Sequence, residues 1–227
     1  MIRAVVFDAY GTLFDVAGAA RAAATRPDGA ALADLWPRLA EDWRRKQLEY
    51  SWLRAIGNAH TGFDQVTADA LDWAMELHGL TDPALRNMLL SLYQSLPAYP
   101  EVPAVLDAVR GQGRLTAILS NGTPAMLAAA TASAGIAHLF DAVISVEEVG
   151  VFKPHASVYA LTHRHLGTAP GEVLFVSSNA WDVAGAAAFG FATVWVNRAG
   201  LPADRLPGRP AHVLPDLSAL PDIARNL

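Results

Sequence analysis

The chain has 227 residues, of which 52% are hydrophobic and 17% are charged, and its net charge at pH 7 is -5. This composition supplies enough apolar surface for a packed core, and it argues against a protein that binds nucleic acid through a basic surface. Because the chain has no cysteine, disulfides, thiolate nucleophiles and cysteine-ligated metals are excluded. We find no signal-peptide pattern and no apolar run of the roughly 18 residues that a membrane span requires. We therefore expect a cytoplasmic protein with neither nucleic acid nor a membrane as its partner.

The first predicted element is a strand over residues 4–7, whose Ala-Val-Val-Phe run is typical of a strand buried on both faces. Asp8 follows it directly, and Gly11 and Thr12 then break the apolar pattern. In open α/β sheets, ligands bind beyond the carboxyl ends of the strands. A buried, ionised carboxylate at such a place requires a cation or a hydrogen-bond donor. Asp8 is thus a candidate functional group, and a helix-cap or turn aspartate is the alternative.

Residues 15–96 have a helical pattern that is rich in Ala, Leu, Arg and Glu and has hardly any β-branched run. One helix is predicted around residues 32–54, where Pro37 is expected to kink or divide it. A second is predicted over residues 64–78, with Gly79 as its stop, and a third begins at Asp82. The apolar positions that define these helices are Leu32, Leu35, Trp36, Leu39, Trp43, Val66, Ala70, Trp73, Ala74, Leu77, Leu85, Leu89, Leu92 and Leu96.

From residue 99 onward, helix and strand patterns alternate. Strands are predicted over residues 115–119, 142–146, 173–176 and 193–196, and helices over 102–109, 126–134, 158–166 and a short segment ending at 189. Alternating units of this kind predict a parallel sheet with helices on both faces. The predicted fold is therefore α/β, a Rossmann-like parallel-sheet core (residues 1–14 and 98–227) with an inserted all-helical cap domain (residues 15–97).

Polar clusters stand at the ends of several predicted strands. Asp8 follows the first, Ser120 and Asn121 follow the second, and residues 177–182 follow another, while Lys153 comes after a fourth. Because the carboxyl ends of parallel strands share one edge of the sheet, these residues should gather in one crevice. A carboxylate, a lysine, hydroxyls and amides in one place fit a site with an activated nucleophile. The alternative is that each is an ordinary polar loop residue.

Four segments of the sequence resemble, in order, the four motifs of the haloacid dehalogenase superfamily: residues 7–15 (FDAYGTLFD), 119–122 (LSNG), 153–154 (KP) and 177–182 (SSNAWD). Residues 43–50 and 175–182 are similar to stretches of the L-2-haloacid dehalogenases (type II). Phosphatases of the superfamily carry a second Asp where this chain has Tyr10, and they hold Mg²⁺ partly through an Asp where it has Ser177-Ser178. Since Mg²⁺ prefers carboxylate oxygens, the resemblance favours a dehalogenase without metal or cofactor.

The resemblance implies hydrolytic dehalogenation of L-2-haloalkanoic acids to D-2-hydroxy acids. Asp8 would attack the α-carbon, halide would leave, and water would hydrolyse the aspartyl ester. The partners would be a small halogenated carboxylic acid and a halide ion, and the chain would form a homodimer through its cap helices. Alternatives are a fluoroacetate or azetidine-2-carboxylate hydrolase using the same attack, a Mg²⁺-dependent small-molecule phosphatase, and a catalytically silent binding protein.

The resemblance also implies roles for individual residues. Lys153 would keep Asp8 ionised, and Asp182 would pair with Lys153 and position or deprotonate the hydrolytic water. Arg44, Asn179 and Trp181 would hold the halide, although Arg44 lies in a charged run that is usually a solvated helix face. Arg45 and Ala9 depart from the common family pattern and bear on specificity. The implied catalytic residues are Asp8, Thr12, Lys153, Tyr159, Ser177, Asn179 and Asp182, and the implied substrate-binding residues are Ala9, Tyr10, Arg44, Leu48, Phe63, Ser120, Asn121 and Trp181.

Overall fold

The computed structural model describes residues 1–16 and 35–227. Its described part contains a six-stranded sheet in the order β3-β2-β1-β4-β5-β6, and every neighbouring pair is parallel. The predicted parallel α/β core is therefore confirmed. The strands are β1 (Ala4–Phe7), β2 (Leu115–Ser120), β3 (Ala142–Ser145), β4 (Val173–Ser177), β5 (Ala192–Val196) and β6 (His212–Leu214).

The predicted strands agree with the observed ones to within one residue at each end, because each is an apolar run bounded by polar or glycine residues. Two observed elements were not predicted. One is β6, an edge strand of three residues in which Val213 is more than half exposed. The other is the C-terminal helix α9 (Leu220–Asn226), which packs on α5 (Val102–Gly111). Short, half-exposed elements have too little hydrophobic periodicity to be recognised from sequence.

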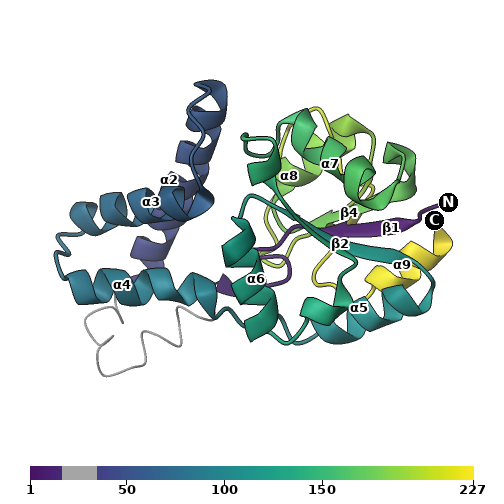
Figure 1. Ribbon diagram of the computed structural model, residues 1–227, viewed down its shortest axis with the longest axis horizontal. Helices are drawn as coiled ribbons and strands as arrows, with labels where there is room; N and C mark the ends of the chain where they lie inside the picture. Colours follow the sequence, from purple (N-terminus) through teal and green to yellow (C-terminus); the bar gives the residue numbers. More distant parts are fainter. Residues whose placement is uncertain (17–34) are drawn as a thin grey trace.

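Helices cover both faces of the sheet (Figure 1). On one face lie α7 (Ala156–Leu166) and α8 (Ala180–Phe189), and on the other lie α5 (Val102–Gly111), α6 (Pro124–Ser133) and α9. The ends predicted for two of these helices, at residues 166 and 189, are confirmed, since the next residues, Gly167 and Gly190, both have the left-handed backbone that ends a helix. This two-sided cover leaves the carboxyl edge of the sheet as the place for a site.

Between β1 and α5 the described chain is helical and lies beside the carboxyl edge of the sheet (Figure 1). We call residues 35–96 the helical insertion. It consists of α2 (Trp36–Ile56), α3 (Phe63–Leu77), α4 (Pro83–Ser91) and a 3₁₀ turn, Leu92–Gln94. The N-cap prediction for Asp82 is confirmed, because its side chain accepts a hydrogen bond from the amide of Ala84 at 2.8 Å. The boundaries predicted for the cap domain stay a prediction, and the Leu32 position lies outside the described residues.

Three details of the predicted helices are wrong. Pro37 lies in the first turn of α2, where a missing amide hydrogen costs nothing, so it does not divide the helix. Leu77, placed on the buried face of α3, is 54% exposed. The third helix ends at Ser91 and continues only as a 3₁₀ turn, although Leu89 and Leu96 are both fully buried as the apolar stripe implied.

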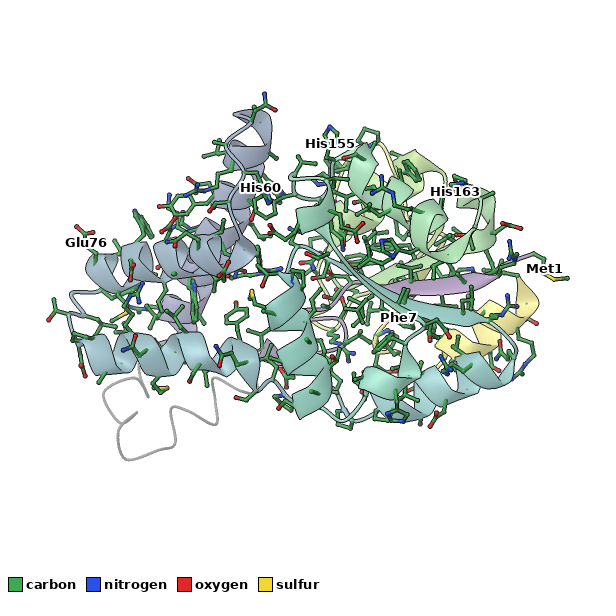
Figure 2. All side chains as sticks on the ribbon, in the orientation of Figure 1. Met1, Phe7, His60, Glu76, His155 and His163 are labelled. Carbon is green, nitrogen blue, oxygen red and sulfur yellow. The ribbon has the colours of Figure 1, made fainter. Side chains whose placement is uncertain are left out.

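The helical insertion is joined to the core by polar as well as apolar contacts. His60, in the loop between α2 and α3, lies within 3.2 Å of the Glu147 carboxylate in the core, and its ring packs on Phe152. Figure 2 shows His60 where the insertion faces the core. Within the part of the chain that the structure describes, no helix is long and apolar enough to cross a bilayer.

Gly185 of α8 allows a close contact that the site requires. A Cβ there would lie 2.6 Å from both the Tyr159 hydroxyl and the Pro154 side chain. We therefore expect Gly185→Ala to lower the free energy of unfolding by about 1–3 kcal/mol, the usual cost of overpacking a core. Urea unfolding followed by circular dichroism measures this change.

Gly111 serves as the matched control. It ends α5, and a Cβ there meets nothing within 4 Å, so Gly111→Ala should stabilise by roughly 0.5–1 kcal/mol through helix propensity. Equal effects of the two substitutions would contradict the assignment of a close contact at Gly185.

Candidate active site

The register of the sheet brings the predicted polar clusters together. Phe7 of β1 lies opposite Ile118 of β2 and Val176 of β4, so Asp8 emerges beside Ser177. The strand order reverses its direction of growth between β1 and β4, which is the place where open α/β sheets bind ligands. The predicted convergence of these strand ends is therefore observed.

The carboxylate of Asp8 is 7% exposed and is held through both of its oxygens. Oδ2 accepts hydrogen bonds from Asn179 Nδ2 at 2.9 Å, Thr12 Oγ1 at 3.1 Å and Ser177 Oγ at 3.3 Å. Oδ1 accepts one from Lys153 Nζ at 3.2 Å. Oδ2 is thus a fixed oxygen with three donors, whereas Oδ1 has a single bond within the described residues and retains lone pairs for another partner.

The orientation of the Thr12 hydroxyl follows from its neighbours. Its oxygen receives the amide hydrogen of Ser178 at 2.8 Å and lies 3.1 Å from Ser178 Oγ. Since a hydroxyl has one hydrogen, an arrangement in which Ser178 donates to Thr12 leaves Thr12 free to donate to Asp8. Gly11, with a φ of 83°, places this loop so close that a Cβ would lie 3.1 Å from Ser178 Oγ.

Lys153 is 1% exposed and lies between two carboxylates. Its ammonium group is 3.2 Å from Asp8 Oδ1 and 2.8 Å from Asp182 Oδ2. Burial favours the neutral amine, but the charges of Asp182 and Asp8 outweigh it, so the pKa of Lys153 is raised above its ordinary value. The lysine therefore carries a positive charge throughout the physiological pH range.

Asp182 is completely buried in the first turn of α8. Its Oδ2 binds Lys153, and its Oδ1 accepts a hydrogen bond of 2.8 Å from the Tyr159 hydroxyl. Burial raises the pKa of Asp182, Lys153 opposes this effect, and Asp8 adds to the increase. Tyr159 donates to Asp182 and makes no hydrogen bond to Asp8. It therefore supports the second carboxylate that binds Lys153 and not the nucleophile itself.

A chamber of about 20 Å³ adjoins the Asp8 carboxylate. Since one water molecule needs roughly 10–15 Å³ by this measure, the chamber has room for about one water. Of the residues singled out from the sequence, Ala9, Thr12, Tyr159, Ser177 and Asp182 do not line it. The lining residues are Asp8, Tyr10, Arg44, Leu48, Phe63, Ser120, Asn121, Lys153, Asn179 and Trp181, all of them predicted.

Arg44 reaches the chamber from α2 and is not on a solvated helix face. Its Nη1 donates to Gln47 Oε1 at 2.6 Å and its Nη2 to Asn179 Oδ1 at 3.1 Å. The neighbouring Arg45 points elsewhere, because its side chain is 50% exposed and pairs with Asp42 at 2.8 Å. Although Arg45 departs from the common family pattern, it therefore adds no positive charge to the chamber.

Two buried donors at the chamber lack a partner among the described residues: the Tyr10 hydroxyl and Trp181 Nε1. Burial raises the pKa of Tyr10, and Tyr93 and Asp8 add to the effect, so the phenol stays neutral. Because buried polar groups are nearly always hydrogen-bonded in native proteins, an unpaired pair of donors beside a small chamber is typical of a binding site for an electron-rich ligand.

Ser120 and Asn121 follow β2 at the other side of the chamber. Ser120 Oγ accepts from the amide of Gly122 at 3.1 Å, and Asn121 Oδ1 accepts from the amide of Lys153 at 3.0 Å. Asn121 thereby holds the backbone that carries Lys153 and keeps its Nδ2 group for another acceptor. The side chain of Ala9 is fully buried in the core, so the smaller residue at this position does not widen the chamber.

Three groups at the site were not predicted from the sequence: Gln47, Phe152 and the Ser178 hydroxyl. Gln47 is fully buried and holds Arg44, and its own Nε2 donates to Thr67 Oγ1 at 2.8 Å. Because Gln47 follows Arg44 by three residues on one helix, the two side chains are neighbours, and this spacing could have identified Gln47 from the sequence. Phe152 packs against Phe63, which lines the chamber. In the sequence, only its position directly before Lys153 indicated that Phe152 lies near the site.

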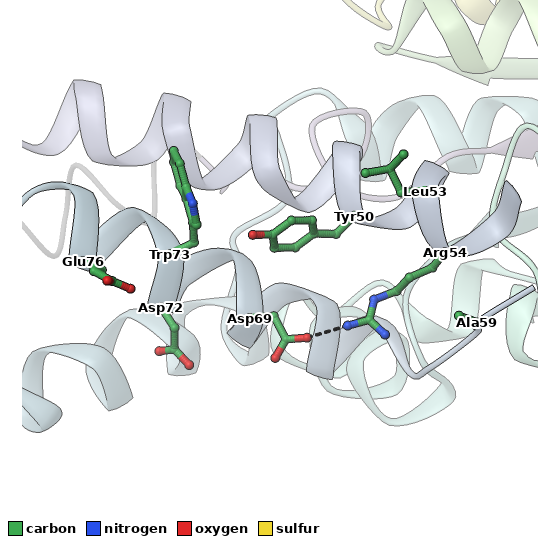
Figure 3. A pocket seen from close by; sticks show the side chains of 8 residues that line it. All are labelled: Tyr50, Leu53, Arg54, Ala59, Asp69, Asp72, Trp73 and Glu76. Atoms are coloured by element: carbon green, nitrogen blue, oxygen red, sulfur yellow. Dashed lines mark hydrogen bonds and ion pairs between the residues drawn. The ribbon is translucent and has the colours of Figure 1, made fainter. Parts of the chain in front are cut away.

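A groove of about 560 Å³ lies on the helical insertion between α2 and α3 (Figure 3). It contains Arg54 paired with Asp69 at 2.8 Å, together with Asp72 and Glu76, but none of the residues around Asp8. Its charges are solvated surface pairs rather than a buried, polarised cluster. Among the residues that the structure describes, no group of His, Asp or Glu side chains has an arrangement that could hold a metal ion.

Comparison with known proteins agrees with this site. Residues 2–190 match the haloacid dehalogenase-like hydrolase family. The chain is 43% identical over its whole length to (S)-2-haloacid dehalogenase 1 of Pseudomonas sp. (strain CBS-3), covering 98% of that protein. It is 46% identical over 199 residues to (S)-2-haloacid dehalogenase of Xanthobacter autotrophicus, covering 87% of this chain and 76% of that one.

A solved structure supports the same grouping. The L-2-haloacid dehalogenase from Xanthobacter autotrophicus with chloropropionic acid covalently bound superimposes with a TM-score of 0.87 at 38% identity, and all of both chains is covered. The predicted resemblance is thereby confirmed: the chain belongs to the haloacid dehalogenase-like hydrolases and, within them, to the L-2-haloacid dehalogenase family.

Proposed function

We propose that this protein hydrolyses L-2-haloalkanoic acids to D-2-hydroxy acids and halide through an ester formed on Asp8. The observation that carries this proposal is the unequal binding of the two Asp8 oxygens, with three donors on Oδ2 and only Lys153 on Oδ1 among the described residues. A family relative with covalently bound chloropropionic acid supports a covalent intermediate. A halide leaves without taking up a proton, so this reaction needs no general acid at the leaving group.

In the first step, Asp8 Oδ1 attacks the α-carbon from the side opposite the halogen. The C–O bond forms while the carbon–halogen bond breaks, and the halide leaves with the electron pair. Arg44, Asn179 and the unpaired Trp181 Nε1 receive the halide, since they line the same chamber. Attack from the opposite side inverts the carbon, so an L substrate gives a D product.

In the second step, water attacks Cγ, the ester carbonyl carbon of Asp8, and the Cγ–Oδ1 bond then breaks, so that the product leaves with Oδ1 as its hydroxyl oxygen and takes up a proton. During the attack, negative charge develops on Oδ2, where Thr12, Ser177 and Asn179 already direct their donors. Donors that are fixed before charge develops are the usual source of strong transition-state stabilisation. Asp182 holds Lys153 in place and has lone pairs left to accept a proton of the incoming water.

The substrate carboxylate is held by Ser120, by the free Nδ2 group of Asn121 and by the amide of Tyr10. These groups line or border the chamber, and the Tyr10 amide donates no hydrogen bond to another described residue. Leu48 and Phe63 supply the apolar wall against which the alkyl group packs. Orientation by a fixed carboxylate site and one apolar wall gives the site its preference for one enantiomer.

An isotope experiment tests the ester mechanism. With enzyme in excess over L-2-chloropropionate in ¹⁸O-labelled water, a single turnover should leave the label in Asp8 and give an unlabelled hydroxyl group in the product. The reason is that the product oxygen comes from Asp8 Oδ1 and the water oxygen stays on the carboxylate. Mass spectrometry of the tryptic peptide containing Asp8 measures this label.

Label in the product after a single turnover would instead show direct attack by water. The control is Asp8→Asn, which keeps the size of the side chain but removes its nucleophilic charge. It should abolish halide release and incorporate no label while retaining the circular dichroism spectrum of the parent.

The D enantiomer of the substrate should release halide at least about a hundredfold more slowly, corresponding to roughly 3 kcal/mol in the transition state.

The activity should fall at acid pH because of Asp182. Protonation of this carboxyl, whose pKa is raised by burial, removes the negative charge that holds Lys153. The Tyr159 hydroxyl stabilises the ionised form and so keeps this pKa lower than it would otherwise be. Tyr159→Phe should therefore raise the pKa of Asp182 further and move the acid limb of the kcat/KM profile to higher pH.

Thr162→Ala is the matched control for this substitution. Its hydroxyl is buried on the same helix and donates to the carbonyl of Tyr159 at 2.9 Å, without a hydrogen bond to Asp182. The acid limb should stay in place for this variant. An acid limb that moves to lower pH in Tyr159→Phe would contradict the assignment to Asp182.

We further infer that the chain forms a homodimer through the helical insertion. Three large apolar side chains are exposed there: Leu53 by 57% and Ile56 by 79% on α2, and Leu77 by 54% on α3. Light scattering after gel filtration should give twice the mass of one chain. The double variant Leu53→Asp/Ile56→Asp should be a folded monomer, because two charges cannot be buried unpaired in such a contact.

Val213→Asp provides the control, since Val213 is exposed by 54% on β6, which lies on the core. This variant should keep the mass of the dimer. A monomer in Val213→Asp and a dimer in the double variant would place the contact on the sheet edge instead.

A further inference from the structure

A second cavity, of about 260 Å³, lies against the chamber at Asp8. The two share three lining residues, Tyr10, Arg44 and Asn179. Elsewhere the second cavity is largely aromatic, with Trp36 and Trp43 from α2 among its walls. It therefore combines apolar walls with an inner end that carries a cation and an amide.

The sizes of the two cavities differ in a way that matters for the reaction. The chamber at Asp8 holds about one water, whereas 2-chloropropionate has six non-hydrogen atoms. The substrate therefore does not fit beside Asp8 in this conformation. The neighbouring cavity is more than ten times larger, and Tyr10, Arg44 and Asn179 line both cavities where they adjoin.

Arg44 and Asn179 are two of the three residues that line both cavities. A hydrogen bond of 3.1 Å joins Arg44 Nη2 to Asn179 Oδ1 at this boundary. The other end of the guanidinium group is held by Gln47, which is buried and is itself bound to Thr67 and Tyr93. Breaking the bond to Asn179 would open the boundary while Gln47 continues to hold Arg44 at the border of both cavities.

We propose that this cavity, the approach pocket, is the route by which the haloacid reaches Asp8, and that the Arg44–Asn179 hydrogen bond closes it. This inference rests on the proposed dehalogenase function. The apolar walls accept the halogenated alkyl group, and the positive charge of Arg44 attracts the carboxylate toward the inner end. Once the substrate has passed, re-formation of the hydrogen bond separates the reacting atoms from the pocket.

Chemical modification of the folded protein at position 40 tests this proposal. Ala40 lines the approach pocket on α2, one turn before Arg44, and is absent from the lining of the chamber. Because the natural chain has no cysteine, Ala40→Cys introduces a single thiol that benzyl methanethiosulfonate can label. The attached benzylthio group fills the pocket after folding is complete, and a reductant removes it again.

Labelling should lower kcat/KM by about tenfold or more for both chloroacetate and L-2-chloropropionate, as expected when productive access to a site is blocked. Reduction, followed by removal of the reductant, should restore the activity. Thermal unfolding before and after labelling checks that the fold is retained. The control is Val213→Cys, 54% exposed on β6 of the core and outside the lining of both cavities, whose labelled form should keep full activity.

Three results would overturn the proposal. One is full activity of completely labelled Ala40→Cys, with completeness checked by intact mass. Another is failure of its thiol to react under native conditions in which Val213→Cys reacts fully. The third is loss of activity toward L-2-chloropropionate with chloroacetate unaffected, since this would make the pocket an alkyl subsite and not a passage. Failure of the proposed function is distinct, because the unmodified enzyme would then release no halide from either acid.

Discussion

The interaction on which the site depends is the buried ammonium group of Lys153 between the carboxylates of Asp8 and Asp182. All three groups are almost fully excluded from solvent. Removing one partner of such a buried pair typically costs about 3–5 kcal/mol, because the remaining charge has no compensation. Several surrounding hydrogen bonds serve this arrangement: Asn121 holds the lysine backbone, and Tyr159 holds the far side of Asp182. The sheet places its members, since Asp8 and Asp182 follow the adjacent strands β1 and β4.

Much of this arrangement could be predicted from the sequence because it depends on local patterns. Each buried strand is an apolar run, and a parallel sheet brings the residues after such runs to one edge. Asp8, Lys153 and Asp182 were identified on that basis and by family resemblance. The resemblance also gave the wall residues Leu48 and Phe63, which periodicity alone would treat as ordinary packing on α2 and α3.

Other features depend on tertiary contacts that no local pattern reveals. The direction of Arg44 is determined by the buried amide of Gln47 and by Asn179, 135 residues away in the chain. The depth of Asp182 follows from the packing of α7 against α8 at Gly185. Arg45 and Ala9 drew attention as departures from a family pattern, yet one lies at the surface and the other in the core, so neither reaches the chamber.

Lys153, which is buried, and Arg44, which is partly buried, also determine how charge moves in the proposed reaction. In the proposed mechanism, one negative charge lies on Asp8 beside Lys153 before the first step, and after it the ester is neutral and the charge lies on the halide near Arg44. The total charge of the site is therefore the same before and after this step. Transfer between two fixed cations avoids the large free-energy cost of creating a new charge in a medium of low dielectric constant. A largely buried site is therefore compatible with an ionic reaction, because the starting and final positions of the charge each have their own counterion.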